Sequence, residues 1–281
     1  MASLRSFLGA GGSSLGAMVA LAHSATAQVS RSPDVHFVPT PHEVVAAMLK
    51  VANVRRNDVL FDLGSGDGRI VIAAAKKYGT RGTGIDIDSV RVAEGRLGAR
   101  KAGVANKARF QRADLFQTDL REATVVTLYL LPTLNVKLRP KLYAELKPGS
   151  RVVSHAFDMG SWKPDSTFMV GTSAVFYWVI PANVGGEWAL TAPGGKEYTL
   201  RLTQKFQHIE GTAELNGNSV PVSAAGVHGD KVILELADPD GPVRLVGRVK
   251  DGGLMTGTAR GSKWSARRNG PAPDLGMEAD A

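Results

Sequence analysis

The 281-residue chain contains no cysteine, which excludes disulfide bonds, zinc–thiolate sites and a thiol nucleophile. No apolar run is long enough to cross a bilayer as a mature helix. The histidine and acidic residues show neither metal-ligand spacing nor a Ser-His-Asp pattern. Lysine and arginine give a net charge of +8, but they are scattered along the chain. We therefore expect general basicity and no nucleic-acid partner.

The N-terminal region resembles an export signal. Arg5 is its only charged residue, an apolar stretch covers residues 15–22, and Ala25-Thr26-Ala27 forms a small-x-small cleavage pattern. We predict a signal peptide over residues 1–27 and a mature chain that begins at Gln28. Export to the periplasm follows from this prediction, whereas an uncleaved signal would leave the protein cytoplasmic or anchored to a membrane.

Residues 28–182 alternate between strand and helix patterns. Because the expected strands are continuously apolar, the alternation predicts a doubly wound, Rossmann-like parallel sheet. Thr40-Pro41-His42-Glu43 has the form of a helix capping box. The expected strands are 58–63, 82–86, 109–115, 123–131 and 151–157, with one or two more in 168–180. The first expected helix begins near residue 44. The other expected helices cover 69–78, 89–102 and 133–146, and the last is interrupted at Pro140.

After Pro181 the helix patterns stop. Short runs with alternating polarity, such as residues 198–203 and 232–236, are separated by turn signals such as Asn216-Gly217-Asn218. This texture predicts a small antiparallel all-β sheet or barrel over residues 183–268, to which no functional motif can be assigned. The tail over residues 269–281 is rich in proline, glycine, alanine and aspartate, and we expect it to be disordered.

The chemistry is concentrated in Asp62-Leu-Gly64-Ser65-Gly66-Asp67-Gly68, which follows the first expected strand. A glycine-rich turn at this place lets a ligand pack on backbone amides. The dinucleotide pattern requires a third glycine at position 69, which is Arg69. An acidic residue before Gly-x-Gly-x-Gly instead suits a ligand that carries an ammonium group. That ligand is S-adenosylmethionine.

Two more acidic residues follow later strands. Asp86 lies 22 residues after Gly64, where a carboxylate can accept both ribose hydroxyls, and Asp114 is placed to accept from the adenine amino group. We expect cofactor contacts from Asp62, Gly64, Ser65, Gly66, Asp67, Asp86, Asp114 and Leu115. Arg69 is expected to close the loop by pairing with a nearby carboxylate.

These stretches resemble the seven-stranded, class I methyltransferases. Over residues 35–181 the chain is most similar to the archaeal protein-lysine methyltransferases of broad substrate range and to the ATP synthase c-subunit lysine methyltransferase family. The similarity rests on Phe37-Val-Pro-Thr40-Pro41, DLGSGDGRIVIAAAK, GIDID, ATVVTLYLLPTLN, LKPGSRVVSHAF and Trp162. It implies a seven-stranded methyltransferase sheet and places Thr40 beside the methionine end of the cofactor. The export signal departs from the archaeal members.

The segment from Tyr129 to Asn135 lines the acceptor side in this fold. It lacks the Asn/Asp-Pro-Pro-aromatic motif of enzymes that methylate exocyclic amines of bases or glutamine. Tyr129 is the candidate wall of the acceptor channel and Asn135 the candidate that orients the amine. A packed strand residue and a helix cap are the structural alternatives for the two. His155, Ser154 and Trp162 are interpreted as structural.

The sequence as a whole predicts a protein-lysine N-methyltransferase that uses S-adenosylmethionine, binds no metal and acts as a monomer on a protein substrate. A small-molecule N- or O-methyltransferase, and an envelope binding protein with a degenerate cofactor site, are the alternatives. Since the sulfonium already activates the methyl group, we expect no indispensable general base.

Overall fold

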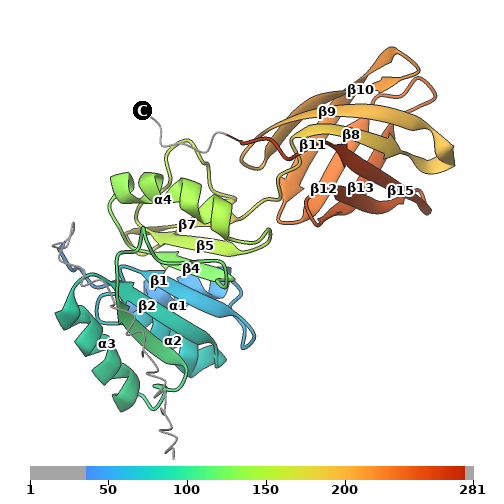
Figure 1. Ribbon diagram of the computed structural model, residues 1–281. Coiled ribbons are helices and arrows are strands. Elements are labelled where there is room, and N and C mark those ends of the chain that lie inside the picture. The colour runs from blue at the N-terminus through green and yellow to red at the C-terminus, as the bar shows by residue number, and fades with distance from the viewer. Residues whose placement is uncertain (1–35, 276–281) are drawn as a thin grey trace, which may run out of the picture.

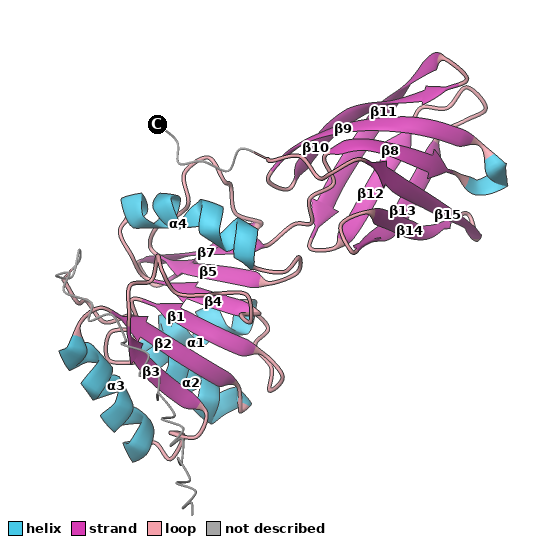
Figure 2. Cartoon of the chain, in the orientation of Figure 1, coloured by secondary structure: helices cyan, strands magenta, loops and turns pink. Residues whose placement is uncertain are grey.

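The computed structural model describes residues 36–275. The expected signal peptide and the cleavage site before Gln28 lie outside this range. Within it the chain forms an α/β unit followed by a separate β-barrel (Figures 1 and 2). No helix in the described range is long and apolar enough to span a membrane.

The α/β unit contains the expected seven-stranded sheet, in the order β3-β2-β1-β4-β5-β7-β6. Strands β1 to β5 pair in parallel, whereas β7 runs antiparallel to both β5 and β6. The strands are β1 (Val59–Leu63), β2 (Arg81–Asp86), β3 (Ala108–Arg112), β4 (Val125–Leu128), β5 (Arg151–His155), β6 (Ser166–Val170) and β7 (Ser173–Val179). The order of the strands reverses between β1 and β4, which is where open α/β sheets bind ligands.

Helices cover both faces of this sheet (Figure 2). Helices α1 (His42–Val51), α2 (Arg69–Tyr78) and α3 (Ser89–Lys101) pack on one face, in a core that includes Val125 and Val153. Helix α4 (Pro132–Glu145) packs on the other face with Val126 and Val152. Successive residues of β4 and β5 thus enter opposite cores, which explains why these strands are apolar throughout.

Two local expectations differ from the structure. The capping box before α1 does not form, because the Thr40 hydroxyl lies 3.2 Å from Nδ1 of His155 and Pro41 is the N-cap. Helix α4 is not interrupted at Pro140 but continues to Glu145. Leu138 and Leu142, on either side of the proline, are fully buried in the core and hold the helix in place.

The loop glycines are required by the protein's own side chains. Gly64, Gly66 and Gly68 all have positive φ, which favours glycine. A Cβ atom at Gly66 would lie 2.2 Å from the Phe37 ring, and one at Gly68 would lie 2.4 Å from the Phe110 ring. Glycine is therefore needed in this loop partly because the Phe37 and Phe110 rings pack directly against its backbone.

The all-β region is a closed eight-stranded barrel, in the order β10-β11-β12-β13-β14-β15-β8-β9. Every described pairing in it is antiparallel. Its interior is filled by buried side chains that include Trp188, Tyr198 and Trp264, so it is a packed core. The strands are β8 (Gly186–Thr191), β9 (Glu197–Lys205), β10 (His208–Leu215), β11 (Asn218–His228), β12 (Lys231–Leu236), β13 (Val243–Lys250), β14 (Leu254–Ala259) and β15 (Ser262–Asn269), with a 3-10 turn η1 (Pro193–Gly195).

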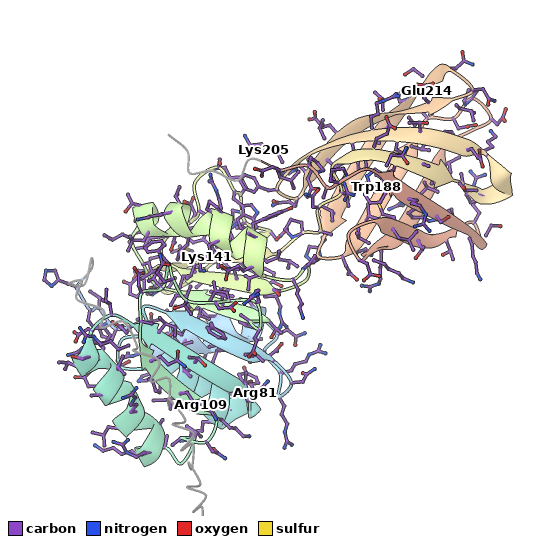
Figure 3. All side chains as sticks on the ribbon, in the orientation of Figure 1. Arg81, Arg109, Lys141, Trp188, Lys205 and Glu214 are labelled. Carbon is purple, nitrogen blue, oxygen red and sulfur yellow. The ribbon has the colours of Figure 1, made fainter. Side chains whose placement is uncertain are left out.

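One end of the barrel contacts the α/β unit. Figure 3 shows Lys205 at this end and Glu214 at the opposite end. Phe206, in the turn between β9 and β10, is 4% exposed and belongs to the same core as α4. The neighbouring Gln207 accepts from the Trp162 indole at 3.0 Å and donates to the Lys163 carbonyl at 2.8 Å. The barrel is thereby joined to the α/β unit through buried side chains.

The chain end is attached as far as it is described. Asn269 belongs to β15, and the Asn183 side chain donates to the Pro273 carbonyl at 2.8 Å. Leu275 packs against the core of the α/β unit. These contacts involve the first part of the tail that was expected to be disordered, and residues 276–281 lie outside the described range.

Candidate active site

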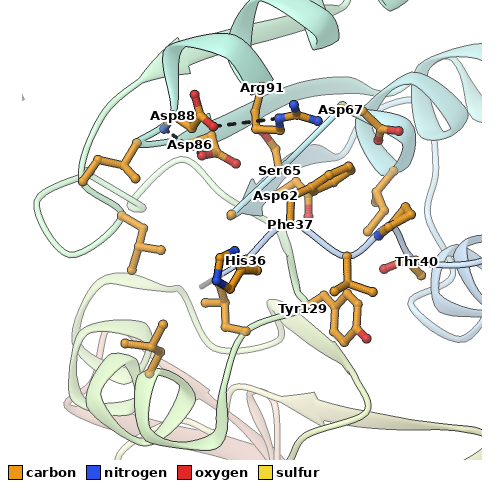
Figure 4. Close-up of a pocket in the computed structure, with 18 of the residues that line it drawn as sticks. His36, Phe37, Thr40, Asp62, Ser65, Asp67, Asp86, Asp88, Arg91 and Tyr129 are labelled. Atoms are coloured by element: carbon orange, nitrogen blue, oxygen red, sulfur yellow. Dashed lines mark hydrogen bonds and ion pairs between the residues drawn. The ribbon is translucent and has the colours of Figure 1, made fainter. Parts of the chain in front are cut away.

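A cavity of about 370 Å³ lies at the carboxyl ends of β1, β2 and β4. Its position matches the reversal of strand order, and Figure 4 shows the residues around it. Of the predicted site residues, the lining includes Thr40, Asp62, Gly64, Ser65, Asp67, Asp86, Asp114, Leu115 and Tyr129. Gly66 and Asn135 are not among the lining residues.

Asp62 places a buried carboxyl in the cavity. Its side chain is 2% exposed, and Oδ1 accepts from the Thr127 hydroxyl at 2.7 Å. Burial raises the pKa of Asp62, the hydrogen bond from Thr127 opposes this rise, and the nearby carboxylates of Asp86 and Asp67 add to it, so that the net pKa is about 7. A buried carboxyl of this kind is stabilised in its ionised form by a cationic ligand. The ammonium group of an amino acid provides that cation.

The carboxylate of Asp86 organises the loop and keeps room for a ligand. Its Oδ2 accepts from the Gly66 amide at 2.8 Å and its Oδ1 from the Asp88 amide at 2.9 Å. Each carboxylate oxygen can accept two hydrogen bonds, so one position on each oxygen remains for a diol. Asp114 lies just beyond β3, and its Oδ1 accepts from the Phe116 amide at 2.8 Å.

Ser65 lines the cavity, and its hydroxyl lies beside Gly84, where a Cβ atom would be 2.7 Å from it. Its hydroxyl is buried and has no hydrogen-bond partner among the described residues. A buried hydroxyl without a partner costs free energy, and contact of this hydroxyl with a cofactor stays a prediction.

Asp67 is paired within the loop, as expected for a carboxylate near Arg69. The Arg69 guanidinium donates to Asp67 at 2.6 Å and to the Thr40 carbonyl at 2.8 Å. Burial by itself would raise the pKa of Asp67, but hydrogen bonds from Arg69 outweigh burial and hold this pKa below its usual range. The loop is thus closed onto the segment before α1.

Tyr129 lies at the end of the cavity opposite Asp86 in the view of Figure 4. Its ring lies 3.9 Å from the His155 ring and 6.3 Å from the Phe157 ring, measured between centroids. His155 is 3% exposed, and burial lowers its pKa, so the imidazole is neutral near pH 7. Together these rings form an aromatic wall in which Tyr129 lines the cavity, while His155 and Phe157 pack against Tyr129 and are not among the lining residues.

Asn135 lies in α4 behind this wall and is fully buried. Its amide nitrogen donates to the Ser154 hydroxyl at 3.1 Å and to the carbonyls of Phe157 and Asp158 at 3.1 and 3.2 Å. These bonds fix the loop after β5. The geometry gives Asn135 a positioning role toward Phe157, and contact with an acceptor stays a prediction.

The strap of residues 36–39 lines the cavity together with Thr40 and was not predicted from the sequence as part of the site. Phe37 lies over Gly66, and the Arg91 guanidinium lies 4.7 Å from the centre of its ring. Asp88, Arg91 and Phe116 also line the cavity without having been predicted, whereas Leu134 belongs to the segment 129–135 that was expected on the acceptor side. The contact between Phe37 and Gly66 joins two distant parts of the sequence. The occurrence of Phe37 together with the glycine loop was the one sequence signal that could have indicated it.

The fold and the pocket define a class I methyltransferase that uses S-adenosylmethionine. The sheet has the required order, Asp62 is suited to the ammonium group, Asp86 to the ribose and Asp114 to the base. Ser65 lines the same cavity. Among residues 36–275 no cluster of histidine and acidic side chains could hold a metal ion.

Comparison with known proteins identifies the family. Residues 62–166 match the model of the ANTKMT methyltransferase domain. A protein-lysine N-methyltransferase from Saccharolobus islandicus is 44% identical over 143 residues, which are 50% of this chain and 89% of that protein. The human ATP synthase c-subunit lysine N-methyltransferase is 33% identical over 165 residues, or 59% of this chain and 70% of that protein.

A solved methyltransferase structure has the same fold as part of this chain. The RNA methyltransferase from Salinibacter ruber, in complex with S-adenosyl-L-homocysteine, is 56% identical with a TM-score of 0.50, and the match covers 51% of this chain and 94% of that one. The chain therefore belongs to the family of the ANTKMT-type protein-lysine N-methyltransferases. The family model ends at residue 166, before the barrel begins.

Proposed function

We propose that the protein is a protein-lysine N-methyltransferase. The observation that carries the proposal is the 44% identity to the Saccharolobus islandicus enzyme over 89% of that enzyme's length. Several further relatives are named as lysine N-methyltransferases of the ATP synthase c-subunit or of adenine nucleotide translocase. The Tyr129 ring, against which His155 and Phe157 pack, supports the proposal, because it lines the cavity and suits the methylene chain of a lysine.

The residues of this chain act mainly by holding the two reactants. The cofactor supplies a methyl group that its sulfonium has already activated. Asp62 binds the ammonium group, Asp86 the ribose and Asp114 the base. Tyr129 then confines the acceptor amine to the line of attack, which converts a bimolecular step into an oriented one.

Deprotonation of the acceptor follows from the surroundings. A free lysine has a pKa of about 10.4, so only about four molecules in ten thousand are neutral at pH 7. Burial against the aromatic wall and beside a sulfonium lowers that pKa. As the amine is buried, it loses its proton to water. No side chain therefore has to serve as an indispensable base.

A labelling experiment tests the acceptor class. Purified protein is incubated with S-adenosylmethionine carrying a tritiated methyl group and an extract of the source cells. Label that is removed by protease and found on methyl-lysine supports the proposal. Dialysable label in a product that chromatography separates from S-adenosylmethionine identifies a small-molecule enzyme instead. An absence of any transfer, with tight cofactor binding in calorimetry, identifies a binding protein.

RNA is the second candidate acceptor, because the 56% identical Salinibacter ruber protein is described as an RNA methyltransferase. The same experiment separates the two candidates, since label on RNA is removed by ribonuclease and resists protease. The missing Asn/Asp-Pro-Pro-aromatic motif after β4 favours the protein acceptor.

We also propose that the protein is exported after removal of residues 1–27 and that it acts as a monomer. The small-x-small pattern before Gln28 supports the first proposal. N-terminal sequencing of the protein from a periplasmic fraction tests it, and an intact Met1 in the cytosol contradicts it. Light scattering of the purified chain tests the second.

A further inference from the structure

The outer surface of the barrel is divided by charge. Outward positions alternate with buried ones along each strand, so the charged residues on each strand can be assigned to the outer face. On β12 to β15 the outward charged residues are six cationic (Lys231, Arg244, Arg248, Lys250, Lys263 and Arg267) and one anionic (Glu235). On β8 to β10 they are four anionic (Glu187, Glu197, Glu210 and Glu214) and two cationic (Arg201 and Lys205).

The six cationic residues of β12 to β15, here called the basic wall, form one continuous surface. Lys231 pairs across strands with Arg248, and Leu254 lies between Lys250 and Arg267 in the next row. Neighbouring strands are about 4.8 Å apart, so these side chains share one field. In the closed strand order, β13 is four strands away from β9 in either direction. The basic wall therefore lies opposite β8 to β10, whose outward charges are mostly anionic.

Most of this charge is not neutralised by the protein. Arg248 pairs with Asp230 at 2.5 Å, and Arg244 has Glu235 as its cross-strand neighbour. Within residues 36–275, Lys231, Lys250, Lys263 and Arg267 make no ion pair, and all four are exposed. Like charges fixed on one rigid face repel one another, and an anionic partner relieves that repulsion.

The rest of the surface indicates which anion fits. The outward positions between the cations are small or aliphatic and include Leu254, Thr256, Thr258 and Ser265. Trp264, the sole aromatic residue of β12 to β15, faces the core. Single-stranded nucleic acids are bound by stacking bases on exposed aromatic rings, whereas lipid phosphates need only a broad cationic surface.

We propose that the basic wall binds the phosphate head groups of an anionic lipid bilayer and holds the protein against the membrane surface. The wall shares no residue with the cavity of the active site. Membrane binding and methyl transfer can therefore be separated by mutation, and the proposal does not depend on the identity of the acceptor.

Vesicle sedimentation with the purified full chain tests this proposal. The protein is expected to pellet with vesicles of phosphatidylcholine that contain about one third phosphatidylglycerol, to stay in solution with phosphatidylcholine alone, and to be released by salt. Lys250→Gln with Arg267→Gln is expected to weaken the partition by about tenfold or more. The matched control, Arg201→Gln with Lys205→Gln on the opposite face, removes the same charge and is expected to change it less than twofold.

Equal binding to both kinds of vesicle, or equal loss in the two double variants, would overturn the proposal. Binding of homopolymeric RNA that is tighter than vesicle binding and is lost in Lys250→Gln with Arg267→Gln would also overturn it, by assigning the wall to nucleic acid. Thermal unfolding shows whether each variant is folded. Lys231→Gln with Lys263→Gln repeats the test at other positions of the wall, with the same expected loss.

Discussion

The ring of Phe206 in the barrel lies parallel to the ring of Trp162 in the α/β unit, with centroids 5.4 Å apart and an angle of 5° between their planes. The Arg139 guanidinium lies 5.3 Å from the centre of the same Phe206 ring. Arg139 also donates to the carbonyl of Met159 at 3.1 Å. The barrel thus contributes a side chain to the core beside the loop that carries Phe157.

Replacing Phe206 with alanine is therefore expected to destabilise the α/β unit as well as the barrel contact. Loss of a buried phenylalanine costs about 3–5 kcal/mol in the free energy of unfolding. Urea unfolding followed by tryptophan fluorescence measures this change. Lys205→Ala, at the exposed neighbouring position, is the control and is expected to stay within about 0.5 kcal/mol. Equal effects of the two substitutions on the free energy of unfolding would show that the ring contact does not stabilise the protein.

The alternation of strands and helices was predictable because each element has its own hydrophobic period. Helix α2 was expected over residues 69–78 and is observed there, and the acidic residues after β1 and β2 do line one cavity. The contact between Phe206 and Trp162 was not predictable, since no periodicity connects residues 44 positions apart in different units. Thr40 was misjudged as a helix cap because His155, its actual partner, is 115 positions away.

Asp86 is expected to contribute strongly to cofactor affinity. Asp86→Ala removes an acceptor for the ribose hydroxyls and also releases the amides of Gly66 and Asp88. A hydrogen bond to a charged group contributes about 1.5–3 kcal/mol, so the dissociation constant for S-adenosylmethionine should rise about tenfold to a hundredfold. Calorimetry measures it. Asp119→Ala, an exposed aspartate paired with Arg121, is the control, and an unchanged affinity in Asp86→Ala would refute the ribose contact.

The raised pKa of Asp62 gives cofactor binding a definite pH dependence. In the cofactor-free protein this pKa is about 7, and only the ionised carboxylate pairs with the ammonium group. Affinity should fall by up to about tenfold for each pH unit below 7 and level off above it. Titration calorimetry between about pH 5 and 7.5 measures the slope. Asp62→Asn should bind weakly with no slope over this range, and a slope that persists in Asp62→Asn would assign the dependence to another group.

The same pKa shift affects stability with the opposite sign. The folded pKa of Asp62 lies above the unfolded value, so the protonated carboxyl favours folding. This contribution is complete below about pH 4 and is lost as pH rises through about 7. Urea unfolding of the cofactor-free protein should therefore show that Asp62→Asn gains stability relative to the parent as pH increases from 5 to 8. A difference that does not change with pH would contradict the buried, raised pKa.

The Tyr129 ring, rather than its hydroxyl, is expected to serve methyl transfer. The ring lies 3.9 Å from the His155 ring, measured between centroids, and lines the cavity, where we expect it to confine the acceptor. Tyr129→Phe keeps this surface and should retain kcat/KM within about threefold, whereas Tyr129→Ala opens the wall to water and should lose about tenfold to a hundredfold. Tritium transfer to protein in the cell extract measures both rates, and calorimetry should show cofactor affinity unchanged in both variants. If Tyr129→Phe loses as much activity as Tyr129→Ala, the hydroxyl itself takes part, and the acceptor amine is oriented by a hydrogen bond instead of by the shape of the wall.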